Sequence, residues 1–269
     1  MWHQGTLNGN IATCRIKISE HNNEQNCYYL THIYAWDSSG NNININQEQA
    51  QALLVYMKSA SLQQPSQMPA NVHFAKTNLY IPGQFQDIPA NQWYTSGVED
   101  AFCFGLMKGI GSNTFGPYGD VTIAEAFTMA SRIHCIYSAG HDNIRAAGPG
   151  ENWYQPYLEY AFQNGIIPSK DYRDPNQRIS RLSFAEMFAS ALPDSALPAI
   201  NHVADNAIPD VSMSDDCASA IYKLYRAGIL AGNDVNGTFS PLTYITRAEC
   251  AVIVSRMAES NNRVSFTLR

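Results

Sequence analysis

The sequence is short of charge. Lys, Arg, Asp and Glu make up 15% of its 269 residues, and the formal net charge is -6. A nucleic-acid-binding protein usually carries a basic excess, so this balance argues against nucleic acid as a partner. Asn, Gln and Ser are abundant instead, which predicts a surface that is polar mainly through uncharged groups.

Long hydrophobic runs are also missing. No stretch approaches the roughly 20 apolar residues that a membrane span needs, so no span is predicted. The first ten residues, MWHQGTLNGN, have neither the basic start nor the apolar core of a signal peptide. Two interpretations stay open: a cytoplasmic protein, or a chain whose leader or larger N-terminal region precedes residue 1.

The six cysteines form no CxxC pair, which argues against a zinc site or a redox dithiol, and no metal or other cofactor is predicted. Cys14 and Cys27 bracket a probable turn and could face each other on paired strands. Two unrelated half-buried thiols are the favoured alternative. The other four are expected in the core: Cys103, Cys135, Cys217 and Cys250.

Catalytic patterns are missing as well. The N-terminal part contains His3, His21, His32 and Asp37, but no G-x-S-x-G, H-E-x-x-H or paired carboxylates accompany them. The chain is therefore predicted not to be an enzyme.

What the chain does contain is an internal repeat. Three prolines, Pro117, Pro175 and Pro241, are each followed four residues later by an apolar residue and then by a helix-capping Thr or Ser. Upstream of each proline, an apolar-periodic segment ends in a glycine and a short apolar pair: VEDAFCFGLM, LEYAFQNGII and IYKLYRAGIL. These glycines lie 60 and 63 residues apart, and each suits a left-handed residue just past a helix C-terminus.

Each unit is thus predicted to be a helix, a Gly turn, a loop with a buried aromatic residue, and a second, capped helix. Units of roughly 60 residues bury too little surface alone, so three copies are expected to share one core. We place them at residues 84–140, 141–200 and 201–269. The fold class is mainly α.

The first 83 residues have a different texture. ATCRIKIS and NCYYLTHIYAW alternate in polarity and predict a β-hairpin, and INQEQAQALLVYMKSASL predicts a helix. The Pro/Gln-rich QQPSQMPANVH follows as a linker. Residues 1–83 therefore form a small α+β domain whose function the sequence does not indicate.

The stretch PLTYITRAEC, residues 241–250, contains a charge in an unusual place. Thr246 and Glu249 form a capping box, which explains both residues structurally. Arg247, however, stands in the first turn, where the positive end of the helix dipole disfavours it. We therefore expect an anion near it.

Two stretches carry a recognisable likeness: FQDIPANQWYTSGVEDAFCFGLMKGIGSNTFGPYGDVTIAEAFTMASRI and IPDVSMSDDCASAIYKLYRAGILAGNDVNGTFSPLTYITRAECAVIVSRM. They resemble S-layer homology domains, with their F-x-D start, G-x-G turn, F-x-P and T-R-A-E. The third copy has T-R-A-E letter for letter, whereas the first reads TIAE and the second SRLS.

The resemblance implies a pseudo-threefold bundle whose inter-copy grooves hold bacterial secondary cell wall polysaccharide, often with pyruvylated or otherwise acidic sugars. It also implies that Arg247, and by register Arg181, contact the acidic group, which a guanidinium fork suits. Ile123 occupies the same position in the first copy, so that position is expected to be silent or used in packing, leaving at most two competent grooves.

Four further residues are weaker candidates. Trp93 and Trp153 could stack on a sugar face or plug the bundle, and packing is favoured. Asp87 and Asp210 could accept sugar hydroxyls or cap the following helix.

The favoured function is a non-catalytic module that binds cell wall polysaccharide and tethers a protein to the bacterial surface. The localisation follows from the resemblance. The alternatives are a self-assembling surface-layer protein, which would self-associate, and an anchor fragment of a larger wall-active enzyme.

Overall fold

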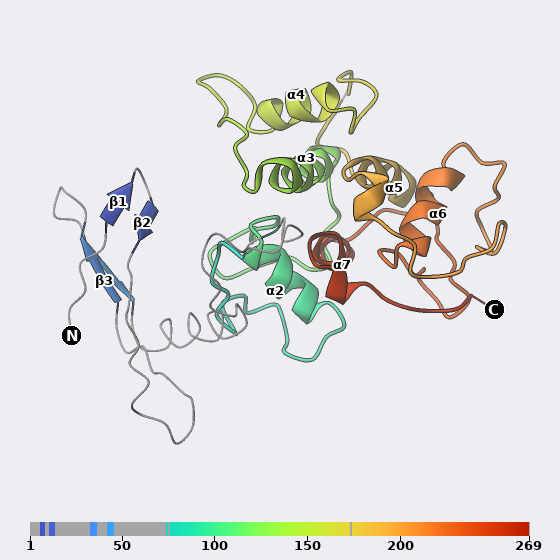
Figure 1. The fold of residues 1–269 in the computed structure, drawn as a ribbon, viewed down its shortest axis with the longest axis horizontal. Helices are drawn as coiled ribbons and strands as arrows, with labels where there is room; N and C mark the ends of the chain where they lie inside the picture. The colour runs from blue at the N-terminus through green and yellow to red at the C-terminus, as the bar shows by residue number, and fades with distance from the viewer. Residues whose placement is uncertain are drawn as a thin grey trace. The chain divides into compact units, whose positions relative to one another are not determined.

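The computed structural model describes residues 74, 76–172 and 174–268, together with the backbone of four short strands nearer the N-terminus. The chain divides into two compact units, Met1–Leu62 and Gln63–Arg269. The ribbon is shown in Figure 1.

The strands of the first unit pair locally. β1 (Thr6–Asn8) pairs antiparallel with β2 (Ile11–Thr13), and β3 (Ile33–Trp36) pairs antiparallel with β4 (Asn42–Ile45). These partners differ from the hairpin predicted between ATCRIKIS and NCYYLTHIYAW. The rest of that hairpin, the predicted helix, the linker, Cys14 and Cys27 lie outside the described residues.

The second unit is mainly helical. The six α-helices of its described residues come in three successive pairs, each with a short first helix and a second helix that begins after a proline turn. The pairs are α2 (Thr95–Cys103) with α3 (Ile123–Ala139), α4 (Gln155–Gln163) with α5 (Arg181–Ser190), and α6 (Ala218–Arg226) with α7 (Arg247–Ala258). Two 3-10 turns, Asp194–Ala196 and Ser260–Asn262, complete the elements. None of the described helices is long and apolar enough to cross a membrane.

The signals that begin and end these helices are those read from the sequence. Thr122 and Thr246 each form a full capping box with the glutamate three residues on, whereas Ser180 accepts only from the backbone N–H of Ser183. Gly105 and Gly228, each just after the C-cap residue of a first helix, have φ of 71° and 72°. Glycine adopts this left-handed conformation without the steric cost that a Cβ would bring.

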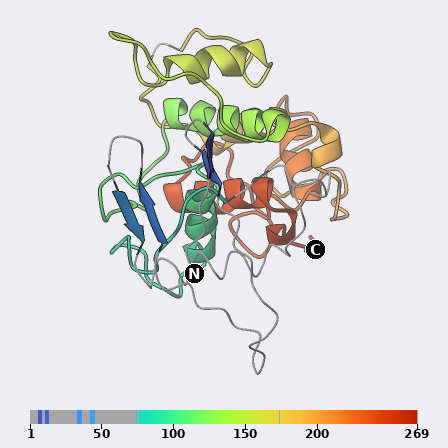
Figure 2. The ribbon, with the colours of Figure 1, turned by 60° about the vertical axis from the view of Figure 1, so that its left-hand side comes forward.

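The two helices of one pair are not the ones that pack most closely against each other. α2 packs mainly against α7, α4 against α3, and α6 against α5 (Figures 1 and 2). One buried contact shows how tight this is: a Cβ added to Gly97 of α2 would lie 2.7 Å from a side-chain carbon of Val252 in α7. Each first helix therefore completes its packing on the second helix of another pair.

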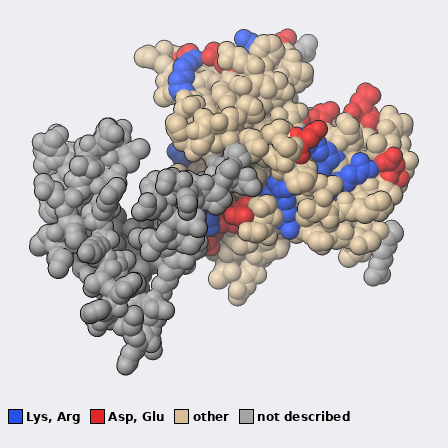
Figure 3. Space-filling model, in the orientation of Figure 1, with Lys and Arg blue, Asp and Glu red and all other residues tan. Residues whose placement is uncertain are grey.

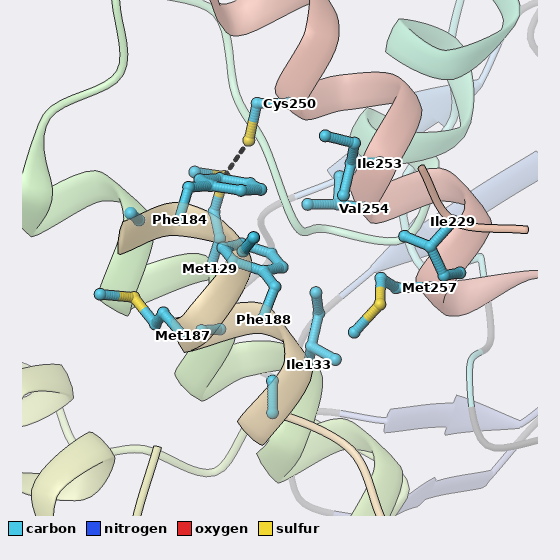
Figure 4. Packing of buried hydrophobic residues seen from close by; sticks show 14 of the residues in the cluster. Met129, Ile133, Phe184, Met187, Phe188, Ile229, Cys250, Ile253, Val254 and Met257 are labelled. Atoms are coloured by element: carbon cyan, nitrogen blue, oxygen red, sulfur yellow. Dashed lines mark hydrogen bonds between the residues drawn. The ribbon is translucent and has the colours of Figure 1, made fainter. Parts of the chain in front are cut away.

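The centre of the unit is built by the three second helices (Figure 4). Met129 of α3 meets Cys250 of α7 with the two sulfur atoms 3.5 Å apart. Phe184 and Phe188 of α5 stack with ring centroids 3.9 Å apart. The four cysteines expected in the core are buried and free.

Backbone hydrogen bonds join the three second helices in cyclic order. The first two N–H groups of α3 donate to Gln177 and Pro175 of the second pair, and those of α5 donate to Thr243 and Pro241 of the third. Those of α7 close the circle by donating to Gly119 and Pro117 of the first pair. N-terminal helix N–H groups have no partner within their own helix, so each proline turn satisfies two groups of a neighbouring pair.

Candidate functional site

Arg247 lies buried between the third and first helix pairs, with 8% of its surface exposed. Its Nε donates to the carbonyl of Phe115 at 3.0 Å, and its Nη2 donates to that of Lys108 at 2.6 Å. Its Nη1 pairs with Glu125 Oε1 at 3.2 Å. Glu125 is the capping-box glutamate of α3, so this carboxylate serves both its own helix and the neighbouring arginine.

Arg181 repeats this arrangement between the second and third pairs, with 5% exposure. Its Nε donates to the carbonyl of Phe239 at 2.8 Å, and its Nη1 pairs with Glu249 Oε1 at 2.6 Å. Among the described residues its Nη2 has no hydrogen-bond acceptor, whereas all three nitrogens of Arg247 are used.

These contacts correct one step of the sequence argument. An arginine in the first helical turn was expected to need an external anion to offset the dipole. The structure supplies the anion from within, because the capping glutamate of the next pair lies beside each arginine.

The junction between the first and second pairs lacks this pair. Ile123 stands where the other junctions have arginine, and Ser183 stands where they have the partner glutamate. The arginine and its partner glutamate are therefore both absent from the same junction. The sequence of either copy alone does not show this, because Ile123 belongs to the first copy and Ser183 to the second.

A groove of about 420 Å³ lies at the Arg181 junction, and we call it the Arg181 groove. Its lining includes Trp93, Arg181, Glu249 and Arg256. Arg256 donates to the carbonyl of Ile229 at 2.9 Å, and burial lowers the pKa of its guanidinium. Within the described part of the chain no carboxylate pairs with it, and the Ile229 carbonyl accepts its hydrogen bond.

A larger groove, about 740 Å³, lies at the Ile123 junction, and we call it the Ile123 groove. Its apolar lining includes Ile123, Ile167 and Met187, and its polar lining includes Ser183 and Glu186. Burial, reinforced by the charge of Asp216, raises the pKa of the Glu186 carboxyl. The position expected to be silent or used in packing therefore lines the larger of the two grooves.

The two tryptophans are exposed. Trp93 is 63% exposed and Trp153 is 52% exposed, so the favoured prediction that they plug the bundle was wrong. The adjacent tyrosine takes the inward place: Tyr94 is 1% exposed and meets Trp93 edge to face at 5.3 Å. The sequence offered two neighbouring aromatics, and the wrong one was assigned to the core.

The two aspartates do not cap the following helices. Asp87 accepts the backbone N–H groups of Phe115 and Gly116 at 2.8 and 2.7 Å. Asp210 accepts those of Phe239 and Ser240 at 2.8 and 2.6 Å. Each carboxylate thus holds the aromatic-x-Pro loop whose carbonyl receives an arginine from the neighbouring pair.

Sequence reasoning missed Arg256 and Glu186. A signal for Arg256 was present, because Arg132 and Arg256 occupy one register of the repeat, nine residues after Ile123 and Arg247, and the middle copy has Ser190 there. Arg132 is committed to Asp142 and to the hydroxyl of Tyr157, whereas Arg256 is not so held. In Figure 3 most of the visible surface of the helical unit is uncharged, and Lys, Arg, Asp and Glu form scattered small patches on it.

No group of three or more His, Cys, Asp and Glu among the described residues could hold a metal ion. The arrangement offers the Arg256 guanidinium, the Arg181 Nη2, which has no acceptor among the described residues, and the exposed indole of Trp93 around one groove. This combination suits recognition of an acidic, ring-shaped solute.

Two stretches match the S-layer homology domain. They are residues 84–127 and 207–251, which hold the first and third proline turns and capping boxes. This domain is a non-catalytic module that anchors proteins to the cell wall, and its presence implies a surface association. The middle helix pair, which lacks a capping box, lies outside the match.

Similar curated proteins include the surface-layer 125 kDa protein of Lysinibacillus sphaericus, 26% identical over 49% of this chain and 12% of that protein. The S-layer protein sap of Bacillus anthracis is 24% identical over 64% of this chain and 21% of its own length. Exoglucanase XynX of Acetivibrio thermocellus is 26% identical over 67% of this chain and 17% of the enzyme. The chain therefore spans about a fifth or less of these relatives.

Proposed function

We propose that this chain anchors a protein to the bacterial cell wall by binding an acidic secondary wall polysaccharide in the Arg181 groove. The observation that carries the proposal is that one groove is lined both by an exposed indole, Trp93, and by Arg256, a guanidinium without a carboxylate partner among the described residues. The match to the S-layer homology domain supports it.

Each lining residue has a role that follows from its chemistry. The Trp93 ring offers a flat apolar face for a sugar ring. Arg256 and the free Nη2 of Arg181 can donate to the carboxylate of an acidic or pyruvylated sugar, and charge-assisted bonds of this kind are the stronger ones. Glu249 keeps Arg181 in place and repels a second acid group.

The other candidates receive smaller roles. Arg247 is fully engaged by protein acceptors, so we assign it to holding the third and first pairs together. Trp153 is proposed as the stacking residue at that junction. The carboxylates of Asp87 and Asp210 are occupied by backbone N–H groups, so we give them no part in binding.

The three helix pairs at 84–140, 141–200 and 201–269 are proposed to be related by approximate threefold symmetry. The cyclic hydrogen bonds between the proline turns and the second helices support this arrangement. A symmetric bundle presents three equivalent junctions, and their lining residues then decide which of them bind.

The proposal is tested with sacculi from a Gram-positive bacterium, with and without the secondary polymer stripped. Trp93→Ala and Arg256→Gln should each weaken binding to intact sacculi about tenfold, because a stacking face or a charged donor is lost. Arg132→Gln, in the same register of α3, is the control and should bind normally. Undiminished binding by Arg256→Gln would remove the Arg181 groove from the proposal.

The similar proteins suggest two kinds of protein that this chain could anchor. Surface-layer proteins and enzymes both appear among them, so the chain is a candidate anchor for either kind of protein. Concentration-dependent assembly of the purified chain would favour a self-assembling surface layer.

A further inference from the structure

The Arg181 and Ile123 grooves occupy equivalent places in the repeat, so their linings can be compared position by position. Five lining residues of the Arg181 groove have a different counterpart around the Ile123 groove. In order, Ile123 stands for Arg181, Ser183 for Glu249, Glu186 for Val252, Ser190 for Arg256, and Asp216 for Trp93.

The replacements change the charge that a ligand would meet. The guanidiniums of Arg181 and Arg256 have no counterpart, and one lining carboxylate, Glu249, is replaced by another at a different position, Glu186. The guanidinium at the edge of the Ile123 groove, Arg178, pairs with Asp120 at 3.1 Å and stacks 3.9 Å from the ring centroid of Tyr244. Its charge and one face of the Tyr244 ring are thus already engaged.

A second cation lies near the same edge. Lys170 places its Nζ 5.3 Å from the ring centroid of Phe162, a lining residue. The lining carboxylate Glu186, the nearby Asp216 and these two cations leave the surroundings close to charge balance. Neither an acid nor an ammonium group gains a dominant partner there.

The remaining lining combines apolar side chains with hydroxyl groups. Ile166, Ile167 and Met187 are buried beneath it. Ser180, Ser183 and Ser190 supply hydroxyls, and Tyr244, 44% exposed, supplies a partly open ring. An uncharged sugar has the same mixture, because its ring faces are apolar and its hydroxyls both donate and accept.

We propose that the Ile123 groove is a second carbohydrate site, which takes an uncharged segment of wall glycan while the Arg181 groove takes an acidic one. Glu186 is the acceptor for sugar hydroxyls, and the apolar side chains contact the ring. The inference rests on the proposed function only in assuming that wall glycan is the ligand; the two grooves select different parts of it.

The test uses the full chain and wall polysaccharide cleaved to oligosaccharides, which anion exchange separates into uncharged and acidic fragments. The methyl NMR signal of Met187 reports on the Ile123 groove, and the indole N–H signal of Trp93 reports on the Arg181 groove. Uncharged fragments should shift the Met187 signal alone, and acidic fragments the Trp93 signal alone.

Added salt gives a second criterion. Raising NaCl from about 50 to 500 mM should weaken the binding of the acidic fragments, because salt screens charge–charge attraction. The binding of the uncharged fragments should stay nearly unchanged. Acidic fragments that shift Met187 as strongly as uncharged ones would overturn the second site. A Met187 signal that no fragment moves would do the same. If the Met187 signal shifts and the Trp93 signal does not, only the proposal that the Arg181 groove binds an acidic glycan would be contradicted.

A matched substitution isolates the acceptor. Glu186→Gln should lower the affinity for the uncharged fragments about fivefold, since a charged acceptor becomes a neutral one. The affinity for the acidic fragments should not change. Glu99→Gln changes the same charge at an exposed position of α2 and should alter neither affinity. Equal effects of the two substitutions would contradict the assignment of Glu186.

Discussion

The junctions between the helix pairs are of two kinds. At two of them an arginine from one pair reaches a capping glutamate and a loop carbonyl of the next. At the third, Ile123 and Ser183 replace both charged residues, and a larger groove is found there. The arginine and the glutamate thus act as one structural unit, since neither is present at the junction that lacks the other.

The largest expected effect comes from breaking such a unit. Arg247→Ala leaves Glu125 and two carbonyls without their guanidinium, so we expect the free energy of unfolding to fall by about 3 kcal/mol. Urea denaturation measures this. Arg178→Ala removes an exposed inter-pair ion pair with Asp120 and should cost at most about 0.5 kcal/mol. Equal losses would show that burial does not distinguish the two pairs.

A double-mutant cycle at the Arg181 junction separates coupling from individual roles. Arg181→Ala and Glu249→Gln should show a coupling free energy of about 1.5 kcal/mol, because their charged groups lie 2.6 Å apart. Gln at position 249 keeps the capping function, so the cycle does not also measure loss of the cap. If the two changes are strictly additive, the ion pair between Arg181 and Glu249 does not contribute to stability.

The arginine–glutamate unit can be transplanted to the junction that lacks it. Ile123→Arg combined with Ser183→Glu places both charged residues at the junction that lacks them. The double variant should be about 1 kcal/mol more stable than the sum of the two single changes. A double variant no better than that sum would mean that the third junction has a different backbone geometry.

The smallest effect concerns an exposed cluster in the middle pair. Arg145 pairs with Glu151 at 2.6 Å and lowers the pKa of that carboxyl to about 2. A depressed folded-state pKa stabilises the protein above the unfolded pKa, and this contribution disappears as the pH falls toward 2. Arg145→Gln should move the Glu151 midpoint, followed by carboxyl NMR, back toward 4.5, its ordinary value. An unmoved midpoint would identify another cause.

Much of the local structure could be read from the chain. The spacing from proline to Thr122, Ser180 or Thr246 located the starts of the second helices, because capping chemistry is local. The turn glycines were equally legible, since a left-handed residue after a helix strongly favours glycine.

The destination of the buried arginines could not be read in this way. Arg247 meets Glu125 across 122 positions of sequence, and no local pattern states which pair borders which. The same limit applies to Trp93, because its exposure depends on Tyr94 having taken the interior place.

The pairing of α2 with α7 has a consequence for how the chain comes to be folded. When α2 leaves the ribosome or emerges from a membrane, its packing partner is still more than a hundred residues away. Asn262, whose side chain donates to Asp100 of α2 at 2.7 Å, is synthesised later still. The face of α2 that packs on α7 therefore stays exposed until the C-terminal residues have been synthesised. A chain truncated before α7 loses its last helix and, with it, the packing partner of α2.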